Sequence, residues 1–338
     1  MTEARLWKAL DDGRVQCRLC SHFCLIEDGS RGLCGVRANM GGRLETLVYD
    51  HVAALGVDPV EKKPLYHYKP GTTTLSFATQ GCNFACTFCQ NATLSQAPKS
   101  GAEPRGERAT PEQLVQAALD NGCESISYTY SEPTIFFELM QDTARLAHEK
   151  GLGNIMVSNG FQSPECLDEL DGLIDAANID LKAFSESFYR DIVGAKLKPV
   201  LKNAKRIKEM GWWLEVTTLL IPGKNDDEEE LKGLARYIAN DLGTDTPWHL
   251  SRFHPDYHMR DVAPTSVPSL EKAWSFGRDA GLKYIYIGNV PGHDYAKTRC
   301  PGCGEVVLNR AGFSLSFSAV SDGHCSACGE RIAGVDLP

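Results

Sequence analysis

Cysteines dominate the chemistry that this sequence could perform. The 338-residue chain carries thirteen of them, and only Cys123 and Cys166 stand alone. The others form three groups: Cys17, Cys20, Cys24 and Cys34; Cys82, Cys86 and Cys89; and Cys300, Cys303, Cys325 and Cys328. Four thiolates can saturate a metal centre by themselves, so the first and last groups can each close a site. The middle group falls one ligand short, and the two lone cysteines are predicted to be packing residues without a function.

The middle group lies in the segment GCNFACTFCQN, residues 81–91, directly after a predicted strand. Three thiolates on one loop can bind three irons of a cubane cluster and leave the fourth iron without a protein ligand. As at a catalytic zinc, an open coordination position is where a small molecule enters. Gly81 allows the backbone to turn sharply away from the strand. The alternative is a zinc knuckle formed by Cys86 and Cys89, with Cys82 incidental.

The two four-cysteine groups are predicted to hold metals of their own. For the N-terminal group zinc is favoured, and an auxiliary iron–sulfur cluster used for electron relay is the alternative. The C-terminal group consists of two knuckles, CPGCG and CSACG, with 21 residues between Cys303 and Cys325. This spacing is typical of a zinc ribbon or a rubredoxin-like site. Zinc is favoured over iron there, because thiolate-only sites in a reducing compartment are most often structural.

Composition excludes several classes of protein. No run reaches the ~18 apolar residues that a membrane helix needs, and the N-terminus lacks the apolar core and cleavage site of a signal peptide. We therefore expect a cytoplasmic protein without membrane contact, whose clustered cysteines bind metals rather than form disulfides. The formal net charge of −9 argues against nucleic acid as a partner, because phosphate binding needs clustered Lys and Arg.

Alternating strands and helices are predicted to position the middle cysteines. The predicted strands are 75–80, 125–130, 154–160, 177–184, 213–220, 247–253 and 283–288, and the predicted helices are 111–121, 134–151, 164–170, 197–210, 226–240 and 268–280. Such alternation predicts an α/β fold with right-handed crossovers and a parallel sheet. This many units favours a full or partial β/α barrel over a flat doubly wound sheet. No G-x-G-x-x-G follows the first strand, which weakens a dinucleotide-binding alternative.

Three domains are predicted. Residues 1–71 form an N-terminal four-cysteine module and linker, residues 72–296 the barrel, and residues 297–338 a small four-cysteine module of the zinc-ribbon or rubredoxin-like kind. The stretch VDPVEKKPLYHYKPG, which ends at Gly71, is predicted to be a loop-like linker because of its prolines and glycine.

The middle triad resembles the signature of the radical S-adenosylmethionine (radical SAM) superfamily. The resemblance is carried by Cys82-x3-Cys86-x2-Cys89, with the aromatic Phe88 just before the last cysteine. It implies a TIM-like radical SAM barrel and a 4Fe–4S cluster whose open iron is chelated by the amino and carboxylate groups of S-adenosylmethionine. It further implies that one electron cleaves the sulfonium to a 5′-deoxyadenosyl radical, which abstracts hydrogen from a substrate. Phe88 is expected to lie near the adenine.

Five further segments at predicted strand ends, where barrel active sites lie, resemble superfamily segments. They are YTYSEPT with Glu132, VSNG with Asn159, NIDLKAF with Asp180 and Lys182, LLIPGKND, and SRFHP with His254. The resemblance implies that Glu132 accepts a hydrogen bond from the cofactor's amino group and that Asn159 approaches the cofactor. It also implies that Asp180 and Lys182 contact the charged methionine end of S-adenosylmethionine. Taken singly, Glu132 or Asp180 fits an ordinary loop cap and His254 a hydrogen-bonded loop residue; five such segments in order are hard to explain as coincidence.

Over nearly the full chain, the sequence resembles the radical SAM member of the AmmeMemoRadiSam system. The N-terminal cysteines, the segment PWHLSRFHPDY and the segment YIGNVPG followed by CPGCG carry this resemblance. Proteins of that family resemble the activating enzymes of pyruvate formate-lyase and other glycyl radical enzymes, and are named for partners of the Memo and AMMECR kinds. The resemblance implies a cofactor and radical chemistry, but no substrate.

Three functional hypotheses remain. The favoured one is a radical SAM enzyme that takes hydrogen from an unidentified substrate, acts with Memo- and AMMECR-like partners and receives electrons from a flavodoxin- or ferredoxin-type donor. A glycyl radical enzyme activase, whose substrate is a protein glycine, is the alternative; the flanking metal modules depart from the minimal activase plan. A non-catalytic multi-zinc scaffold would leave the odd triad unexplained. No general base or nucleophile is singled out, and none is required if the cofactor performs the difficult step.

Overall fold

The computed structural model describes residues 2–290 and 294–338 and is built around one eight-stranded sheet. Seven of its strands are parallel and follow one another in chain order, and β8 pairs antiparallel with β9 at one edge. The strands are β8 (Ala54–Pro59), β9 (Thr73–Ala78), β11 (Ser125–Tyr128), β12 (Gly153–Ser158), β13 (Ala176–Asp180), β14 (Trp213–Leu220), β15 (Trp248–Arg252) and β16 (Ile285–Gly288). The predicted parallel α/β sheet is confirmed.

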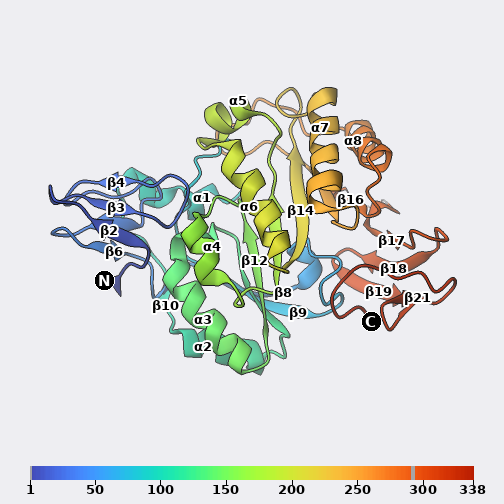
Figure 1. Cartoon of the computed structure of the whole chain (residues 1–338), viewed down its shortest axis with the longest axis horizontal. Coiled ribbons are helices and arrows are strands. Elements are labelled where there is room, and N and C mark those ends of the chain that lie inside the picture. The colour runs from blue at the N-terminus through green and yellow to red at the C-terminus, as the bar shows by residue number, and fades with distance from the viewer. Residues whose placement is uncertain (1, 291–293) are drawn as a thin grey trace.

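Helices connect the parallel strands and cover the sheet (Figure 1). They are α1 (Ala92–Ser95), α2 (Pro111–Asp120), α3 (Phe137–Glu149), α4 (Pro164–Leu170), α5 (Glu186–Phe188), α6 (Leu197–Glu209), α7 (Glu228–Tyr237) and α8 (Val267–Asp279). A capping box starts α2, since the Thr110 side chain accepts the Gln113 N–H and the Gln113 side chain accepts the Thr110 N–H. In α6, Leu197, Val200 and Ile207 are buried at helical spacing and anchor the helix to the core.

The sheet differs from the sequence prediction at its edge. Part of the stretch predicted as linker belongs to β8, where Val57 pairs with Leu75 and Pro59 with Thr73. An edge strand tolerates the terminal proline because its outward N–H positions need no partner. Within the described ranges no pairing joins β8 to β16, so the sheet is open and a full barrel is not confirmed.

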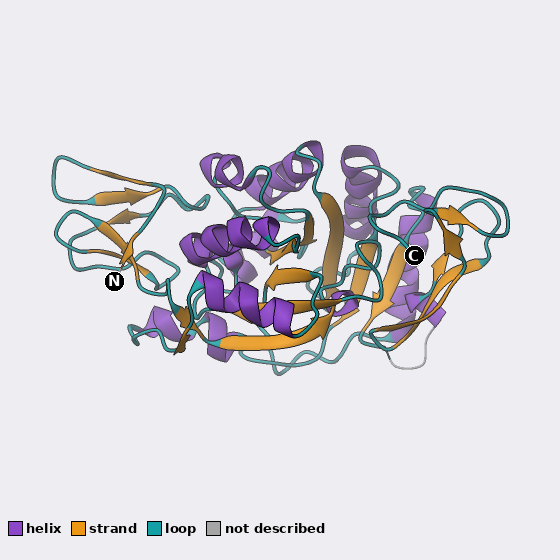
Figure 2. Cartoon of the chain, turned by 90° about the horizontal axis from the view of Figure 1, so that it is seen from below, coloured by secondary structure: helices purple, strands orange, loops and turns teal. Residues whose placement is uncertain are grey.

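Small β modules occupy the two ends of the molecule (Figures 1 and 2). The N-terminal strands are β1 (Thr2–Glu3), β2 (Trp7–Ala9), β3 (Val15–Cys17), β4 (Leu25–Ile26), β5 (Arg37–Asn39) and β6 (Leu44–Thr46), in two three-stranded sheets, and β7 (His51–Val52) pairs with β10 (Glu107–Arg108). The C-terminal strands are β17 (Thr298–Arg299), β18 (Val306–Ala311), β19 (Ser314–Ser318), β20 (Val320–Ser321) and β21 (His324–Cys325). Pro291 and Gly292 of the YIGNVPG segment lie outside the described residues.

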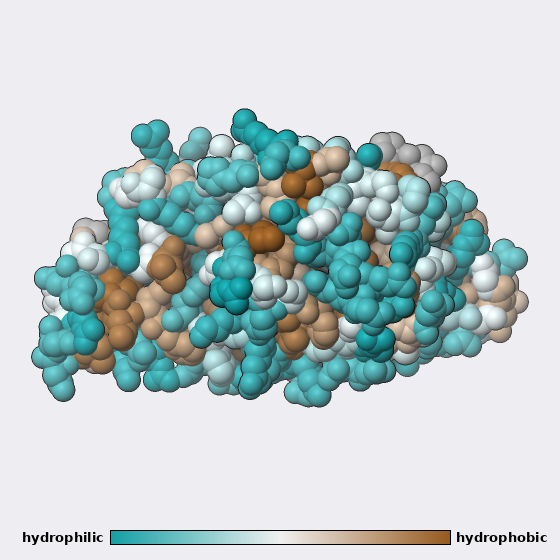
Figure 3. All heavy atoms as spheres, turned by 90° about the horizontal axis from the view of Figure 1, so that it is seen from above, coloured by the Kyte–Doolittle hydropathy of each residue, from teal (hydrophilic) through white to brown (hydrophobic). Residues whose placement is uncertain are grey.

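Hydrophobic side chains gather on the surface of the N-terminal end, at the left of Figure 3. In this module Leu25 is 55% and Leu33 61% exposed. None of the helices in the described ranges is both long and apolar enough to cross a membrane.

The C-terminal module packs on the linker and on β16 through a buried aromatic cluster. Tyr66 and Tyr286 contact Val307 and Leu308 there, and the Arg310 guanidinium donates to the Tyr66 carbonyl at 2.6 Å. His67 lies in the same interface, with Nδ1 2.6 Å from the Ala333 carbonyl and Nε2 2.5 Å from the Tyr286 hydroxyl. Burial lowers the pKa of His67 to about 4.

Acid is expected to loosen this interface through His67. The pKa of His67 is lower in the folded than in the unfolded chain. Neutral His67 therefore contributes fully to the free energy of unfolding above about pH 6.5. This contribution, about 3 kcal/mol, is lost as the pH falls to about 4. Urea unfolding at a series of pH values should show a weaker acid dependence in His67→Gln than in the parent protein. The exposed His324→Gln is the control and should keep the parent dependence; an unchanged profile in His67→Gln would contradict the prediction.

Candidate active site

The middle cysteines lie on the loop between β9 and α1, as the sequence predicts. Gly81 has φ 114°, in the left-handed region that favours glycine, and turns the chain after the strand. The loop is held on two sides, because the Ala85 N–H donates to the Val193 carbonyl at 2.8 Å and the His258 N–H donates to the Thr87 carbonyl at 2.9 Å. Two other segments of the α/β body therefore hold the cysteine loop in place.

The thiols of this loop suit soft metal ions. Burial raises the pKa of Cys86 to about 11, against the opposing charge of Lys182, and burial also raises the pKa of Cys82. Buried thiols become thiolates when metal ions supply compensating positive charge. Two further contacts fix the sulfurs: Cys82 Sγ accepts the Phe84 N–H at 3.3 Å, and Cys89 Sγ lies 3.1 Å from Ser95 Oγ. A soft-metal centre therefore fits the donor set.

Glu132 and Asn159 are brought against the triad from the ends of β11 and β12. Glu132 Oε1 accepts from Thr134 Oγ1 at 2.5 Å and from Ser158 Oγ at 2.7 Å, and Oε2 accepts the Asn159 N–H at 2.9 Å. The Asn159 side chain donates to Asn83 Oδ1 at 2.7 Å and lies 3.9 Å from Cys82 Sγ. Burial raises the pKa of Glu132, while these donors oppose the shift. Oε2, with one donor, is the oxygen that retains capacity for a ligand.

Phe88, Asp180 and Lys182 form a second group beside the triad. Lys182 Nζ is 2.9 Å from Asp180 Oδ2 and 5.7 Å from the centroid of the Phe88 ring. The ring is buried and packs on Phe188 with centroids 6.0 Å apart. Burial acts to lower the pKa of Lys182, but Asp180 and the Cys86 thiol hold it above its usual value. The lysine therefore stays charged next to the cysteine loop.

His254 lies at the rim of the site rather than inside it. Its side chain is exposed, and Nδ1 is 3.2 Å from Gln90 Nε2, on the residue that follows Cys89. Its predicted contact with the cofactor stays a prediction.

Sequence reasoning missed Asn83, Ser158 and Gln162. Asn83 links Asn159 to the cysteine loop, and Gln162 Nε2 donates to Ser158 Oγ at 2.8 Å behind Glu132. Asn83 and Ser158 lie inside the segments GCNFAC and VSNG that the sequence analysis singled out. Their position in those segments was the available signal. Gln162 lies two residues after the second segment, and no sequence signal marked it.

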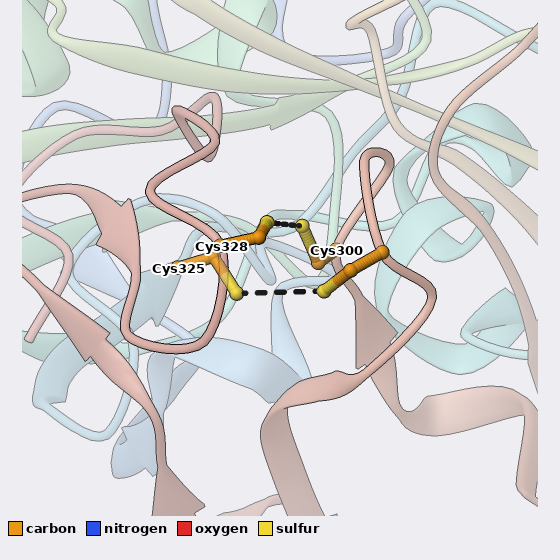
Figure 4. A group of neighbouring side chains, drawn as sticks. Cys300, Cys325 and Cys328 are labelled. Carbon is orange, nitrogen blue, oxygen red and sulfur yellow. Dashed lines mark hydrogen bonds between the residues drawn. The ribbon is translucent and has the colours of Figure 1, made fainter.

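The C-terminal cysteines form a compact site (Figure 4). Among residues 2–290 and 294–338, this is the one group of three or more potential ligands whose ligand atoms all lie within 4.8 Å of one another. Cys300 Sγ is 3.5 Å from Cys328 Sγ, and Cys303 Sγ is 3.8 Å from Cys325 Sγ. Tetrahedral zinc with Zn–S bonds of about 2.3 Å places its sulfurs about 3.8 Å apart. The spacing suits a single ion.

The N-terminal cysteines are also gathered by the fold. Cys17 ends β3, its N–H donates to the Cys24 carbonyl at 2.9 Å, and Cys20 forms a bridge with Gln162. Burial raises the pKa of Cys20, and the neighbouring thiols of Cys17, Cys34 and Cys24 add to the shift. The four thiols therefore lie near enough to one another to interact electrostatically.

One family of known proteins matches this part of the chain. Residues 77–235 match the family model of the radical SAM superfamily, a range that contains the triad, Glu132, Asn159, Asp180 and Lys182. This range, just under half of the chain, forms a radical SAM superfamily domain; members of this superfamily are enzymes, and such a domain implies a 4Fe–4S cluster and S-adenosylmethionine.

Three relatives illustrate the range of similarity. An uncharacterized protein of Methanocaldococcus jannaschii is 43% identical, over 98% of this chain and 99% of its own. The pyruvate formate-lyase-activating enzyme of Clostridium pasteurianum is 22% identical, over 57% of this chain and 84% of its own. A radical SAM methyltransferase from Sphaerobacter thermophilus shares the fold with a TM-score of 0.53 at 18% identity, over 90% of this chain and 80% of its own.

Proposed function

We propose that this chain cleaves S-adenosylmethionine reductively at a cluster held by Cys82, Cys86 and Cys89, and takes hydrogen from a substrate. The observation that carries the proposal is a loop with three thiols and no fourth cysteine, set against Glu132 and Asn159. When bound, the cluster and S-adenosylmethionine would supply the electron and the 5′-deoxyadenosyl radical. The open sheet would act as a partial β/α barrel with its site at the carboxyl ends of the strands.

The residues around the triad would bind and orient the cofactor. Glu132 Oε2 would accept a hydrogen bond from its ammonium group, because Oε1 already accepts three. Lys182, paired with Asp180, would attract the carboxylate of the methionine end. Phe88 would offer its face to the adenine, and His254 would bind the cofactor at the rim.

The substrate is proposed to be one handled with Memo- and AMMECR-like partners, as in the AmmeMemoRadiSam system, with electrons from a flavodoxin- or ferredoxin-type donor. The two added cysteine modules support this reading over a minimal activase. All thirteen cysteines are free thiols, which suits a cytoplasmic location. A glycyl radical enzyme activase is the second candidate, favoured by the similarity to the activating enzyme of Clostridium pasteurianum.

The test follows 5′-deoxyadenosine. Anaerobic, reduced protein is incubated with S-adenosylmethionine and with each candidate partner in turn. We expect slow formation of the nucleoside alone and faster formation with the true partner. Deuterium transferred from a deuterated partner glycine would select the activase, and transfer from another compound would name that substrate class. Absence of the nucleoside in protein with an intact cluster would reject the proposal in favour of a scaffold.

The C-terminal quartet is proposed to hold structural zinc. Purified protein should then contain about one zinc per chain, and Cys303→Ser with Cys328→Ser should remove it and lower the melting temperature. Metal analysis and thermal unfolding check both results. The lone Cys123→Ser is the matched control and should keep the zinc; parent protein that contains no zinc would contradict the assignment.

A further inference from the structure

The N-terminal quartet lies directly against the cysteine loop of the active site. A Cβ on Gly81 would lie 2.8 Å from Val36 Cγ1 and 3.3 Å from the Cys34 carbonyl oxygen. On the same loop, the Asn83 carbonyl is 2.9 Å from His22 Nε2. Glycine at position 81 therefore lets the chain segment of Cys34 touch the residue that precedes Cys82.

A second contact joins the quartet to the loop after β12. Cys20 bridges to Gln162, the Ser21 N–H donates to the Phe161 carbonyl at 2.9 Å, and the Ser163 N–H donates to the Leu19 carbonyl at 3.1 Å. This loop also carries Asn159, whose side chain lies against Cys82. The quartet segment is thus attached to both loops that surround the triad.

The spacing of the quartet differs from that of the C-terminal site. In the C-terminal quartet all four ligand atoms lie within 4.8 Å of one another. In the described residues, neither the N-terminal quartet nor the active-site triad meets this condition. Thiolates on separate irons of a cubane lie farther apart than thiolates on one ion. Four neighbouring thiols at the wider spacing therefore suit a cluster better than a single zinc ion.

We propose that Cys17, Cys20, Cys24 and Cys34 hold a second iron–sulfur cluster, and that electrons reach the triad through it. The relay step rests on the proposed function, while the cluster itself does not. One electron leaves a reduced flavodoxin- or ferredoxin-type donor, which is oxidised, and reduces the quartet cluster. The same electron then passes to the triad cluster, so no proton or group transfer is needed. The module forms one end of the molecule, where such a donor has access (Figure 1).

The first test counts iron without any catalytic assay. Protein in which Cys82, Cys86 and Cys89 are all replaced by serine should retain about four irons per chain, against about eight in the parent. After dithionite reduction it should show the electron paramagnetic resonance of a reduced cluster. Cys166→Ser, a buried lone cysteine, is the matched control and should retain both clusters. Zinc without iron in the triad variant would overturn the proposal, whether or not the parent enzyme cleaves S-adenosylmethionine.

The second test addresses the relay. Dithionite-reduced parent protein should show spin–spin broadening between two clusters, and the broadening should disappear in the triad variant and in Cys20→Ser with Cys24→Ser. In the quartet variant, 5′-deoxyadenosine formation driven by a protein donor should fall at least tenfold more than formation driven by dithionite. Two magnetically isolated signals in the parent, or equal loss with both reductants in a variant that retains the triad cluster, would overturn the relay.

Discussion

Cys82→Ala is expected to reduce 5′-deoxyadenosine formation to background and to lower the iron content by about four atoms per chain. A triad has no spare ligand, so the loss of one thiolate leaves a cubane with two protein ligands and two exposed irons. The effect should be larger than that of any residue that only orients the cofactor, since changes in outer-shell partners typically cost about 10–100-fold.

This prediction separates the triad from every other cysteine in the chain. Cys123→Ala should retain parent iron content and parent nucleoside formation, because the residue is buried and belongs to none of the three cysteine groups. Iron analysis, the visible spectrum of oxygen-free protein and chromatographic quantification of the nucleoside provide the measurements. Parent levels of nucleoside in Cys82→Ala would remove the basis of the proposed chemistry.

Arg37→Ala is expected to lower the free energy of unfolding by about 3–5 kcal/mol. Arg37 of β5 and Glu138 of α3 form an ion pair at 2.8 Å in which both side chains are 1% exposed. The Arg5 N–H donates to the same Glu138 oxygen at 2.7 Å, so this carboxylate holds two segments of the N-terminal module. Without the guanidinium, Glu138 remains as a buried charge that has lost its ion-pair partner.

Two variants test the cause of that loss. Arg37→Met combined with Glu138→Leu should recover most of the stability, because removing both charges leaves no buried ion. Arg14→Ala removes an exposed ion pair to Asp12 in the same module and should change the stability by less than about 1 kcal/mol. Anaerobic urea unfolding of protein with its metals bound measures all three. If the double variant were as unstable as Arg37→Ala, lost packing rather than an unpaired charge would be the cause.

Arg37 also bears on the relay. Its ion pair connects the module that carries the N-terminal quartet to α3, and the Gly81 contact connects the same module to the cysteine loop. The loop itself is held separately, by the Val193 carbonyl and the His258 N–H. Weakening the ion pair should therefore disturb the quartet before the triad.

The local pattern of the sequence was sufficient for the seven parallel strands of the large sheet. Strands with buried apolar residues, such as Ile126 in β11 and Ile155 in β12, alternate with amphipathic helices. The local hydrophobic periodicity and the helix caps predict this alternation. The antiparallel β8 was missed because an edge strand with Pro59 at its end, and with Leu55 exposed, lacks the apolar run of its parallel neighbours.

The sequence by itself pointed to the proposed chemistry, because the number and spacing of thiols on one loop set how many metal ligands the chain offers there. The tertiary structure decided which groups surround that loop. Only folding brings Lys182 within 5.7 Å of the Phe88 ring and the Cys34 segment against Gly81. Those contacts join residues dozens of positions apart, and they depend on crossovers and burial that no local pattern encodes.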